Sequence, residues 1–428
     1  MIDSKMLLAE RYIAPLKSSP DLFIGVELEY PIVHMDGLAT DCGIAKALMY
    51  EVLMDTAWTV VEYDEGDFPI HLQHTNGDHI LFEVSYNTLE FAFAKAKTIQ
   101  EVDRRLHEYV ERIQSFLRQH RHELRGEGIH PCWNYNDNRP VATPRYRMLG
   151  SFLELGRSWK GCHPYTDYGA FICGNQVQFD VARGNFLRVL NAFNRIEPVK
   201  AYLFANSALE EALPGYRISR DFFWEQSMHG VFPENIGIYS RDFQTEDDYL
   251  EYMLDSAMFG IGREEGYAFF PPIRVRDYFA QKVVPSFGSS DTVFPEKEDI
   301  AYHRSYHYQE LTSRGTVEFR SICTQPWERT FAPIAFHLGL LVNLEEMEMI
   351  LSTSDFYRLL NQDCRELRTL FSQKDLSLDE RLLISDLSHS LLDCAYRGLQ
   401  KRGFQEEDYL VRDLWSDGFQ TKSEQLLV

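Results

Sequence analysis

Several short segments of this chain alternate strictly between apolar and polar residues, and a period of two leaves the backbone few choices. In GVELEYPIV, Glu27 and Glu29 alternate with apolar neighbours. The same alternation surrounds Val177 in CGNQVQFDV and Phe319 in GTVEFRSI. Successive side chains of a strand point to opposite faces of its sheet. Each segment therefore predicts a strand with one apolar face and one polar face.

The segment FEVSYNTLEFAF predicts a hairpin that carries two glutamates. A turn at Tyr86 and Asn87 would place Glu83 directly opposite Glu90, on the same face of the two strands. Like charges in such a pair destabilise a sheet, and an unpaired buried carboxylate is very costly. A divalent cation between the two carboxylates is the economical explanation.

Each acidic signal also has an ordinary structural interpretation. An E-x-E pattern can be a solvated face, the hairpin glutamates can both face solvent, and Glu318 can form a plain ion pair with Arg320. Taken together, however, the strands place carboxylates, carboxamides and an arginine on one face. Magnesium prefers oxygen ligands and is commonly shared between carboxylates and phosphates. The combination therefore favours a site for Mg²⁺ and a phosphate-bearing substrate.

The charge balance limits the partners of this chain. It carries 43 basic and 65 acidic residues among 428, a formal net charge of −22. Such a charge disfavours nucleic acid and membrane surfaces, whereas bound metal ions still allow an anionic small-molecule substrate. The seven cysteines form no CxxC pair, and no apolar stretch is long enough for a signal peptide or a membrane span, so we expect a cytoplasmic protein.

Other catalytic signatures are absent from the sequence. It contains no P-loop, GxGxxG, HExxH or GxSxG motif. The histidines of RQHRHE and YHRSYHY are expected to be solvated rather than catalytic. Oligomeric state is left open by the sequence.

Helical periodicity predicts three helical regions. The first begins at Thr98, where Thr98 and Glu101 fit a capping box, and runs to about residue 124. The second covers roughly residues 184–212, and the third roughly residues 331–402.

The chain shows no internal repeat and no Pro/Ser-rich linker. It is therefore predicted to be one catalytic domain over residues 1–428, with a helical C-terminal region from about 331 to 428. Residues 287–300, rich in Gly and Ser and then acidic, are expected to form a loop.

In their order and spacing, these motifs resemble the glutamate–cysteine ligase superfamily, most closely its plant and proteobacterial type, whose catalytic core is related to glutamine synthetase. The resembling pieces are GVELEY, FEVSYNTLEFAF, GIHPCWNYNDNRPVATPRYRMLG, NQVQFDV, LFANSALEEALPGYRISRDFFW and TVEFRSICTQPW, spread between Ile24 and Leu341. The resemblance implies an α+β fold in which a curved, mostly antiparallel sheet forms a funnel-shaped active site with helices packed outside.

The resemblance also implies an activity. ATP, with Mg²⁺ or Mn²⁺, would phosphorylate the γ-carboxylate of L-glutamate, and L-cysteine would then attack the γ-glutamyl phosphate. The product would be a γ-glutamyl amide, which is the first step of glutathione-type thiol synthesis.

Individual residues receive roles from the same resemblance. Metal ligands, which share an oxygen donor on the polar face, are implied at Glu27, Glu29, Glu83, Glu90, Gln176 and Glu318. Arg320 would be catalytic and lie against the transferring phosphoryl group, because a planar guanidinium matches phosphate oxygens. Substrate-binding residues are implied at Arg145, Tyr146, Gln178, Asn206 and Arg220. The two arginines among them would hold the α-carboxylate of glutamate.

The sequence departs from the resembling pattern beside Gln176. The segment CGN replaces the plant-like residues before it, and Gln178 stands where a shorter Asn is expected. These changes bear on the pocket for the acceptor amine, so a ligase of the same chemistry with a different amine or acid is an alternative. A catalytically silent nucleotide-binding homologue is another, although the five metal glutamates and Arg320 speak against it. Asn206 has an alternative role as a cap at a helix end.

Overall fold

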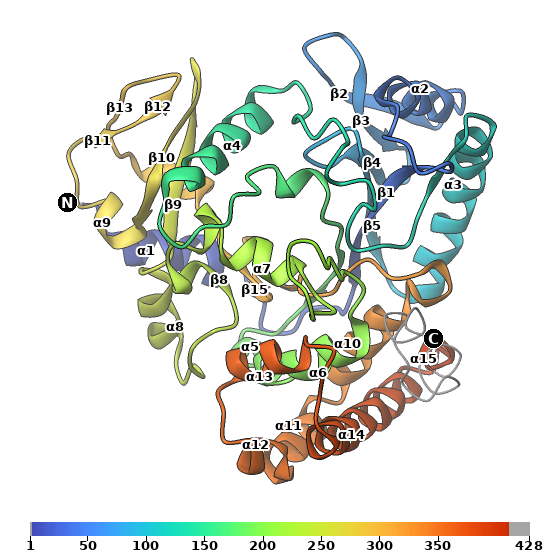
Figure 1. Cartoon of the computed structure of the whole chain (residues 1–428). Helices are drawn as coiled ribbons and strands as arrows, with labels where there is room; N and C mark the ends of the chain where they lie inside the picture. The colour runs from blue at the N-terminus through green and yellow to red at the C-terminus, as the bar shows by residue number, and fades with distance from the viewer. Residues whose placement is uncertain (1, 411–428) are drawn as a thin grey trace.

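A large open antiparallel sheet forms the centre of the computed structural model, which describes residues 2–410 (Figure 1). Its strands follow one another in the order β15-β16-β7-β1-β5-β4-β3-β2, and β6 adds a short pairing to β1. The bounds are β1 Ile24–His34, β2 Trp58–Tyr63, β3 Pro69–His74, β4 His79–Phe82, β5 Thr88–Ala96, β6 His122–Leu124, β7 Asn175–Asp180, β15 Gln309–Leu311 and β16 Thr316–Phe319. The predicted α+β class with a mostly antiparallel sheet is confirmed, and the sheet is not a closed barrel.

The predicted alternation is present in the strands. Val26, Leu28, Val177 and Phe319 are all buried in one hydrophobic core that extends through most of the described chain. Their polar neighbours point to the other face of the sheet, as the period of two requires. The hydrophobic effect of burying the apolar face therefore fixes which side of each strand carries the acids.

The hairpin register differs from the predicted one. Leu81, rather than Glu83, pairs with Glu90, so β4 ends before Glu83 and the connection to β5 is longer than a two-residue turn. Val84 has a φ of 60°, a left-handed conformation that β-branched residues rarely adopt. Its carbonyl accepts a hydrogen bond of 2.7 Å from the N–H of Val141. A turn is present at Tyr86 and Asn87 as predicted, but the predicted register is wrong, because contacts with a distant segment shape the connection before it.

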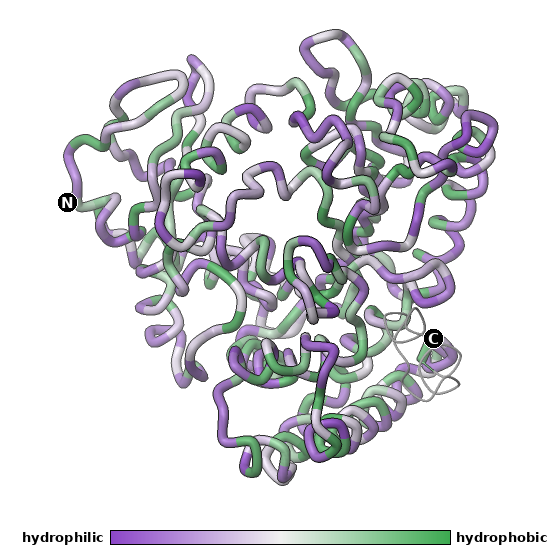
Figure 2. Tube along the Cα trace, in the orientation of Figure 1, coloured by the Kyte–Doolittle hydropathy of each residue, from purple (hydrophilic) through white to green (hydrophobic). Residues whose placement is uncertain are grey.

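Two helices, α2 (Cys42–Leu53) and α3 (Ile99–Gln119), pack on each other beside the sheet (Figure 1). The hydroxyl of Thr98 accepts a hydrogen bond of 3.3 Å from the N–H of Glu101, which confirms the predicted helix start. The helix ends earlier than predicted because the following residues form β6. Apolar and polar residues intermix along the outer helices, as amphipathic helices require (Figure 2).

The second and third predicted helical regions are divided into shorter helices. They are α5 Phe186–Arg195, α6 Glu197–Phe204, α10 Ala332–Val342, α11 Leu344–Thr353, α12 Asp355–Leu360, α13 Cys364–Phe371 and α14 Leu378–Arg402. The second region therefore ends before the predicted residue 212. Gly339 of α10 meets Gly398 of α14 so closely that a Cβ on Gly398 would lie 2.0 Å from the Gly339 carbonyl oxygen.

A second group of elements surrounds the strand pair β9 and β10 (Figure 1). The strands are β8 Ile236–Gly237, β9 Ala257–Arg263, β10 Gly266–Arg274, β11 Val284–Pro285, β12 Phe287–Gly288, β13 Thr292–Val293 and β14 Tyr306–His307. The expected loop at 287–300 thus contains two short strands and the start of a 3₁₀ helix, which a capping box of Glu296 and Asp299 initiates.

The remaining helical elements are short. They are α1 Ser4–Leu8, η1 Ala9–Ile13, α4 Pro144–Glu154, η2 Leu155–Ser158, η3 Tyr168–Ala170, α7 Arg220–Glu225, η4 Met228–Gly230, η5 Pro233–Asn235, α8 Glu246–Met253, α9 Val275–Tyr278, η6 Lys297–Tyr302, η7 Trp327–Arg329 and α15 Asp408–Leu410. Across residues 2–410, none of the helices combines the length and apolarity needed to cross a bilayer.

Candidate active site

A cavity of about 380 Å³ lies over the polar face of the sheet. Its acidic lining comes mainly from the strands, and its arginines come mainly from the segments that surround them. The charged residues lining it are Glu27, Glu29, Glu83, Glu90, Asp221, Glu310 and Glu318, together with Arg11, Arg145, Arg220, Arg304, Arg314 and Arg320. An acidic wall therefore faces a set of cations across one cavity.

Strand register brings the carboxylates together. Glu29 of β1 lies directly opposite Glu90 of β5, and Glu318 of β16 lies directly opposite Glu310 of β15. Glu27 is two residues before Glu29 and shares its face. Like charges at such positions destabilise a sheet unless cations compensate them. The arrangement therefore costs free energy that a bound cation would recover.

The most buried part of the acidic wall centres on Glu29. Its carboxylate accepts hydrogen bonds from the N–H of Gly174 at 2.5 Å and from Nε2 of Gln176 at 2.9 Å. Burial, followed by the nearby Glu83 carboxylate, raises the pKa of Glu29 to about 7. The Oε1 atom of Gln176 is buried without a hydrogen-bond partner. An orphaned acceptor beside a desolvated carboxylate is the environment that a hard cation satisfies.

Gln178 separates two other carboxylates. Its Nε2 donates to Glu27 at 3.2 Å and to Glu318 at 3.4 Å, while its Oε1 accepts from Arg314 at 2.8 Å. Burial, followed by the charge of Glu318, raises the pKa of Glu27 to about 7. A Cβ on Gly25 would lie 2.7 Å from Cγ of Gln178, so the neighbouring strand makes room for the long side chain.

Glu83 and Glu90 remain close despite the changed register. The hydroxyl of Tyr146 donates to Oε2 of Glu83 at 3.0 Å. Burial, followed by the charge of Glu83, raises the pKa of Glu90 well above its usual value. The two glutamates therefore share the cavity as predicted, although the strand pairing that motivated the prediction is not the one that joins them.

The predicted arginines reach the cavity from three different elements. Arg320 follows β16, and its Nη1 lies 2.5 Å from Oε2 of Glu318. Arg220 begins α7 and donates from Nη1 to the carbonyl of Ile322 at 2.8 Å, while its Nε is buried without a partner. Arg145 lies in the first turn of α4. Burial opposes the charge on Arg320, but Glu318 and the other carboxylates outweigh it and raise the arginine's pKa.

The structure does not bring Gln178 or Asn206 into the cavity lining. The Nδ2 atom of Asn206 donates to the carbonyls of Gly126 at 2.9 Å and Thr324 at 2.7 Å, which ties two distant segments together. The preceding helix ends with Ala205 as its C-cap, so the alternative helix-cap role is also not observed. The Nδ2 atom of Asn206 is therefore engaged with the backbone, and its contact with substrate stays a prediction.

The sequence reasoning missed Glu310. This residue is 8% exposed, lines the cavity and accepts a hydrogen bond of 2.5 Å from the hydroxyl of Ser305. Burial raises its pKa to about 7, against the opposing charge of Arg320. Its signal was the short segment YQEL, which forms a hairpin with TVEF and repeats the acid on the same face.

The histidines differ from expectation. His303 and His307 are fully buried, and His122 is 2% exposed, so only His120 of the expected solvated set is exposed. The prediction that these histidines are solvated is therefore wrong for His122, His303 and His307 and right for His120.

The donor set suits Mg²⁺ in its chemistry. Within residues 2–410, no three His, Cys, Asp or Glu side chains already converge as a metal centre. The acidic wall nevertheless offers hard carboxylate oxygens, strained mutual repulsion and the unpartnered Oε1 of Gln176. Those are the ligand types that Mg²⁺ takes, with phosphates completing the octahedron.

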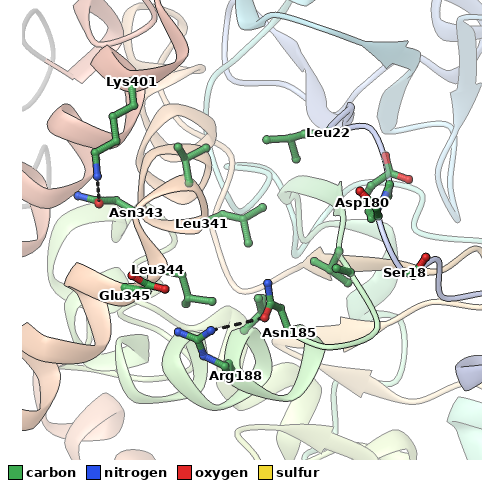
Figure 3. Close-up of a pocket in the computed structure, with 16 residues that line it drawn as sticks. Ser18, Leu22, Asp180, Asn185, Arg188, Leu341, Asn343, Leu344, Glu345 and Lys401 are labelled. Carbon is green, nitrogen blue, oxygen red and sulfur yellow. Dashed lines mark hydrogen bonds between the residues drawn. The ribbon is translucent and has the colours of Figure 1, made fainter.

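A second cavity of about 440 Å³ lies between the end of β7, α5 and the junction of α10 and α11 (Figure 3). Its basic groups are already engaged there: Arg188 pairs with Glu348 at 2.5 Å, and Lys401 donates to Asn343. Asp180, at the end of β7, accepts from the N–H of Phe23. The acidic, arginine-faced cavity is therefore the candidate active site.

The chain has an antiparallel α+β core in which clustered carboxylates face clustered arginines across one cavity. A family model identifies the family. Residues 23–414 match Glutamate-cysteine ligase family 2 (GCS2), and the chain belongs to this family.

Curated relatives carry the same family name. The chain is 23% identical over 374 residues to the chloroplastic glutamate–cysteine ligase of Solanum lycopersicum, covering 86% of this chain and 66% of that protein. It is 25% identical over 292 residues to glutamate–cysteine ligase A of Oryza sativa subsp. indica, covering 67% of this chain and 56% of that protein. The chain thus spans just under two thirds, or less, of the length of these relatives.

Among solved structures, a glutamate–cysteine ligase from Francisella tularensis in complex with AMP aligns with a TM-score of 0.45. It is 12% identical, and the alignment covers 96% of this chain and 85% of that chain.

Proposed function

We propose that this protein is an ATP- and Mg²⁺-dependent ligase that joins the γ-carboxylate of L-glutamate to the amine of L-cysteine. The observation that carries the proposal is the cavity in which carboxylates of the four strands β1, β5, β15 and β16 face arginines from the surrounding segments. Burial raises the pKa values of Glu27, Glu29 and Glu310 to about 7, which means that holding them ionised here costs free energy. Carboxyl groups perturbed in this way and gathered in a cavity are typical of functional sites.

The acidic wall would hold the metal ions. Its members are Glu27, Glu29, Glu83, Glu90, Gln176 and Glu318, which share an oxygen donor directed at the cavity. When bound, Mg²⁺ neutralises charge on the phosphates of ATP during transfer. Tyr146 would act by holding Glu83 in place through its hydroxyl, rather than by touching substrate directly.

The arginines would orient the two anionic substrates. Arg145 and Arg220 would bind the α-carboxylate of glutamate, because the unpartnered Nε of Arg220 offers a second donor beside its bonded Nη1. Arg320 would lie against the phosphoryl group while it moves from ATP to the γ-carboxylate. The amine then attacks the γ-glutamyl carbon, phosphate leaves with the bonding electrons, and the amine loses a proton.

The acceptor amine is the least constrained part of the proposal. Gln178, which replaces the expected Asn, is held by Arg314 and two carboxylates, so its amide is not available to a substrate in this arrangement. That engagement favours keeping a second candidate: a ligase of the same chemistry that takes another amine or acid.

We also propose that the C-terminal helices belong to the same catalytic unit, since one hydrophobic core runs from Leu7 to Leu410. The compartment stays a prediction. The sequence favours the cytoplasm, whereas the curated relatives are named chloroplastic.

One assay tests the function and separates its alternatives. Phosphate release from ATP should require Mg²⁺ and glutamate, and it should rise further with cysteine. An amine panel in place of cysteine identifies a different acceptor if cysteine fails. No release with any pair, together with no ATP binding, would contradict the ligase proposal.

A further inference from the structure

An arginine in the N-terminal segment reaches the candidate active site. Arg11 lies on the π-helix η1 (Ala9–Ile13) and lines the cavity, although its segment precedes residues 23–414 that match the family model. A π-helix is rare, and single π-turns recur at functional sites. The family likeness therefore says nothing about Arg11, and its role has to come from its surroundings.

Buried hydrogen bonds fix the position of Arg11 from behind. Tyr12 bonds Nδ1 of His303 at 2.7 Å, and Nε2 of His303 bonds the hydroxyl of Ser256 at 2.7 Å. Arg11 itself donates from Nη2 to the His303 carbonyl at 3.3 Å. Its Nε is buried and has no hydrogen-bond partner. The guanidinium is thus anchored on one side and leaves donors for a ligand on the other.

Arg304 supplies a second cation beside it. It follows the anchoring residue His303, is exposed, and lines the same cavity. The charges of Arg11 and Arg304 both act on the buried His303 ring, where they reinforce the lowering of its pKa by burial. Both arginines therefore line the cavity beside His303.

Neither arginine has a carboxylate partner among the described residues. By contrast, Arg320 in the same cavity pairs with Glu318, and the buried Arg368 pairs with Glu197. The charge of Arg304 acts on Glu310 but forms no ion pair with it, so a bound anion would find both cations available. Guanidinium groups match phosphate oxygens through paired hydrogen bonds.

We propose that Arg11 and Arg304 form a clamp for the polyphosphate chain of a nucleoside triphosphate. The acidic wall on the strands, with its metal ions, would approach the chain from one side, and the two arginines would approach it from the other. The inference rests on the proposed function, since it assigns residues to the ATP of that reaction. It makes the N-terminal segment part of the site.

Equilibrium binding tests the clamp without turnover. Mg·ATP is titrated into wild-type protein in the absence of glutamate, beside inorganic tripolyphosphate and AMP. Arg304→Gln and Arg11→Gln should each weaken Mg·ATP binding roughly tenfold, the size expected for losing a charge-assisted contact. The affinity for tripolyphosphate should fall in parallel if the clamp binds the polyphosphate chain itself, whereas the affinity for AMP should change less than twofold.

Control variants distinguish a clamp from a structural role. Arg358→Gln removes an exposed arginine of α12 that pairs with Asp355, outside the cavity lining, and should leave all three affinities unchanged. Arg11→Lys keeps the charge but loses the fork, so its affinity should fall between wild type and Arg11→Gln. Melting temperatures identify variants that lose folded protein. Because Arg304 is exposed to solvent, its substitution should disturb folding least.

The outcomes separate the clamp from the proposed function. Mg·ATP binding by Arg304→Gln within twofold of wild type would overturn the clamp and leave the ligase proposal standing. An equal loss of affinity for AMP and for Mg·ATP would also overturn the clamp, because the substitution would then not act through the polyphosphate chain. Wild-type protein that neither binds nor hydrolyses Mg·ATP would overturn both.

Discussion

The acidic wall should make the metal-free protein less stable as pH rises. Burial, followed by the charge of Glu83, raises the pKa of Glu29 from 4.5 to about 7, so the folded state holds the proton more tightly than the unfolded chain. The stability that this carboxyl contributes is fully present below pH 4.5 and is lost as pH rises through about 7. The difference corresponds to roughly 3 kcal/mol for this residue.

Urea unfolding in EDTA at about pH 5.5 and about pH 8 measures the effect. Glu29→Gln cannot ionise, so the fall in the free energy of unfolding between the two pH values should shrink, by roughly 2 kcal/mol, the part of the linkage that lies between about pH 5.5 and about pH 8. Glu65→Gln is the matched control, because its exposed carboxylate pairs with Arg147, which holds the pKa of Glu65 below its usual value and outside this window. Added Mg²⁺ should restore stability at the higher pH through binding to the folded state.

Two results would refute this reasoning. The first is a wild-type free energy of unfolding that rises between the two pH values in EDTA. The second is an unchanged pH difference in Glu29→Gln, which would mean that the carboxyl is already ionised at the lower pH. Stabilisation of the wild type by Mg²⁺ that is equal at both pH values would contradict the link between the acids and the metal.

Other substitutions probe individual roles. Arg320→Ala should lower kcat by roughly two orders of magnitude with little change in KM, as for other preorganised charge donors; a large fall in Tm with proportionate loss of folded enzyme would instead assign Arg320 to neutralising Glu318. Arg220→Lys should raise the KM for glutamate much more than the KM for ATP, because Lys lacks the bidentate fork, and an unchanged glutamate KM would count against the assignment. Glu90→Gln should abolish turnover while the fold persists, and near-normal Mg²⁺ dependence of its activity would exclude it as a ligand. Gly398→Ala should cost about 2 kcal/mol or more in chemical unfolding, because its methyl group meets a carbonyl of α10, and a neutral result would contradict the close packing.

Much of the sheet could be predicted because a period of two is a local property. The alternation around Glu27 and Glu318 identified both the strands and the face that carries the acids. The hairpin register could not be predicted in the same way. Val84 keeps its left-handed conformation because Val141 and the segment around it bind the connection, and those partners are more than fifty residues away.

Some residues of the candidate site have a local sequence signal, and others are brought there only by folding. Residues on strong strand motifs were found, whereas Glu310 sits in a strand of three residues, too short to show a period by itself. The backbone contacts of Asn206 could not be predicted, because a carboxamide near a motif has the same sequence signal whether it bonds substrate or backbone carbonyls. Arg11 carries no local signal, since only folding brings the N-terminal segment beside His303.

The fit between Gly25 and Gln178 has an evolutionary consequence. Because a Cβ at position 25 would overlap Cγ of Gln178, the two positions cannot vary independently. A lineage that gains a side chain at position 25 must also change the side chain at position 178, and that change removes or moves the hydrogen bonds from Gln178 to Glu27 and Glu318. Aligned homologues should therefore show covariation: glycine at position 25 wherever glutamine occupies position 178, and larger residues only beside a short one. Because Gln178 donates to both Glu27 and Glu318, an exchange at position 178 would also alter the acidic wall that is proposed to hold the metal.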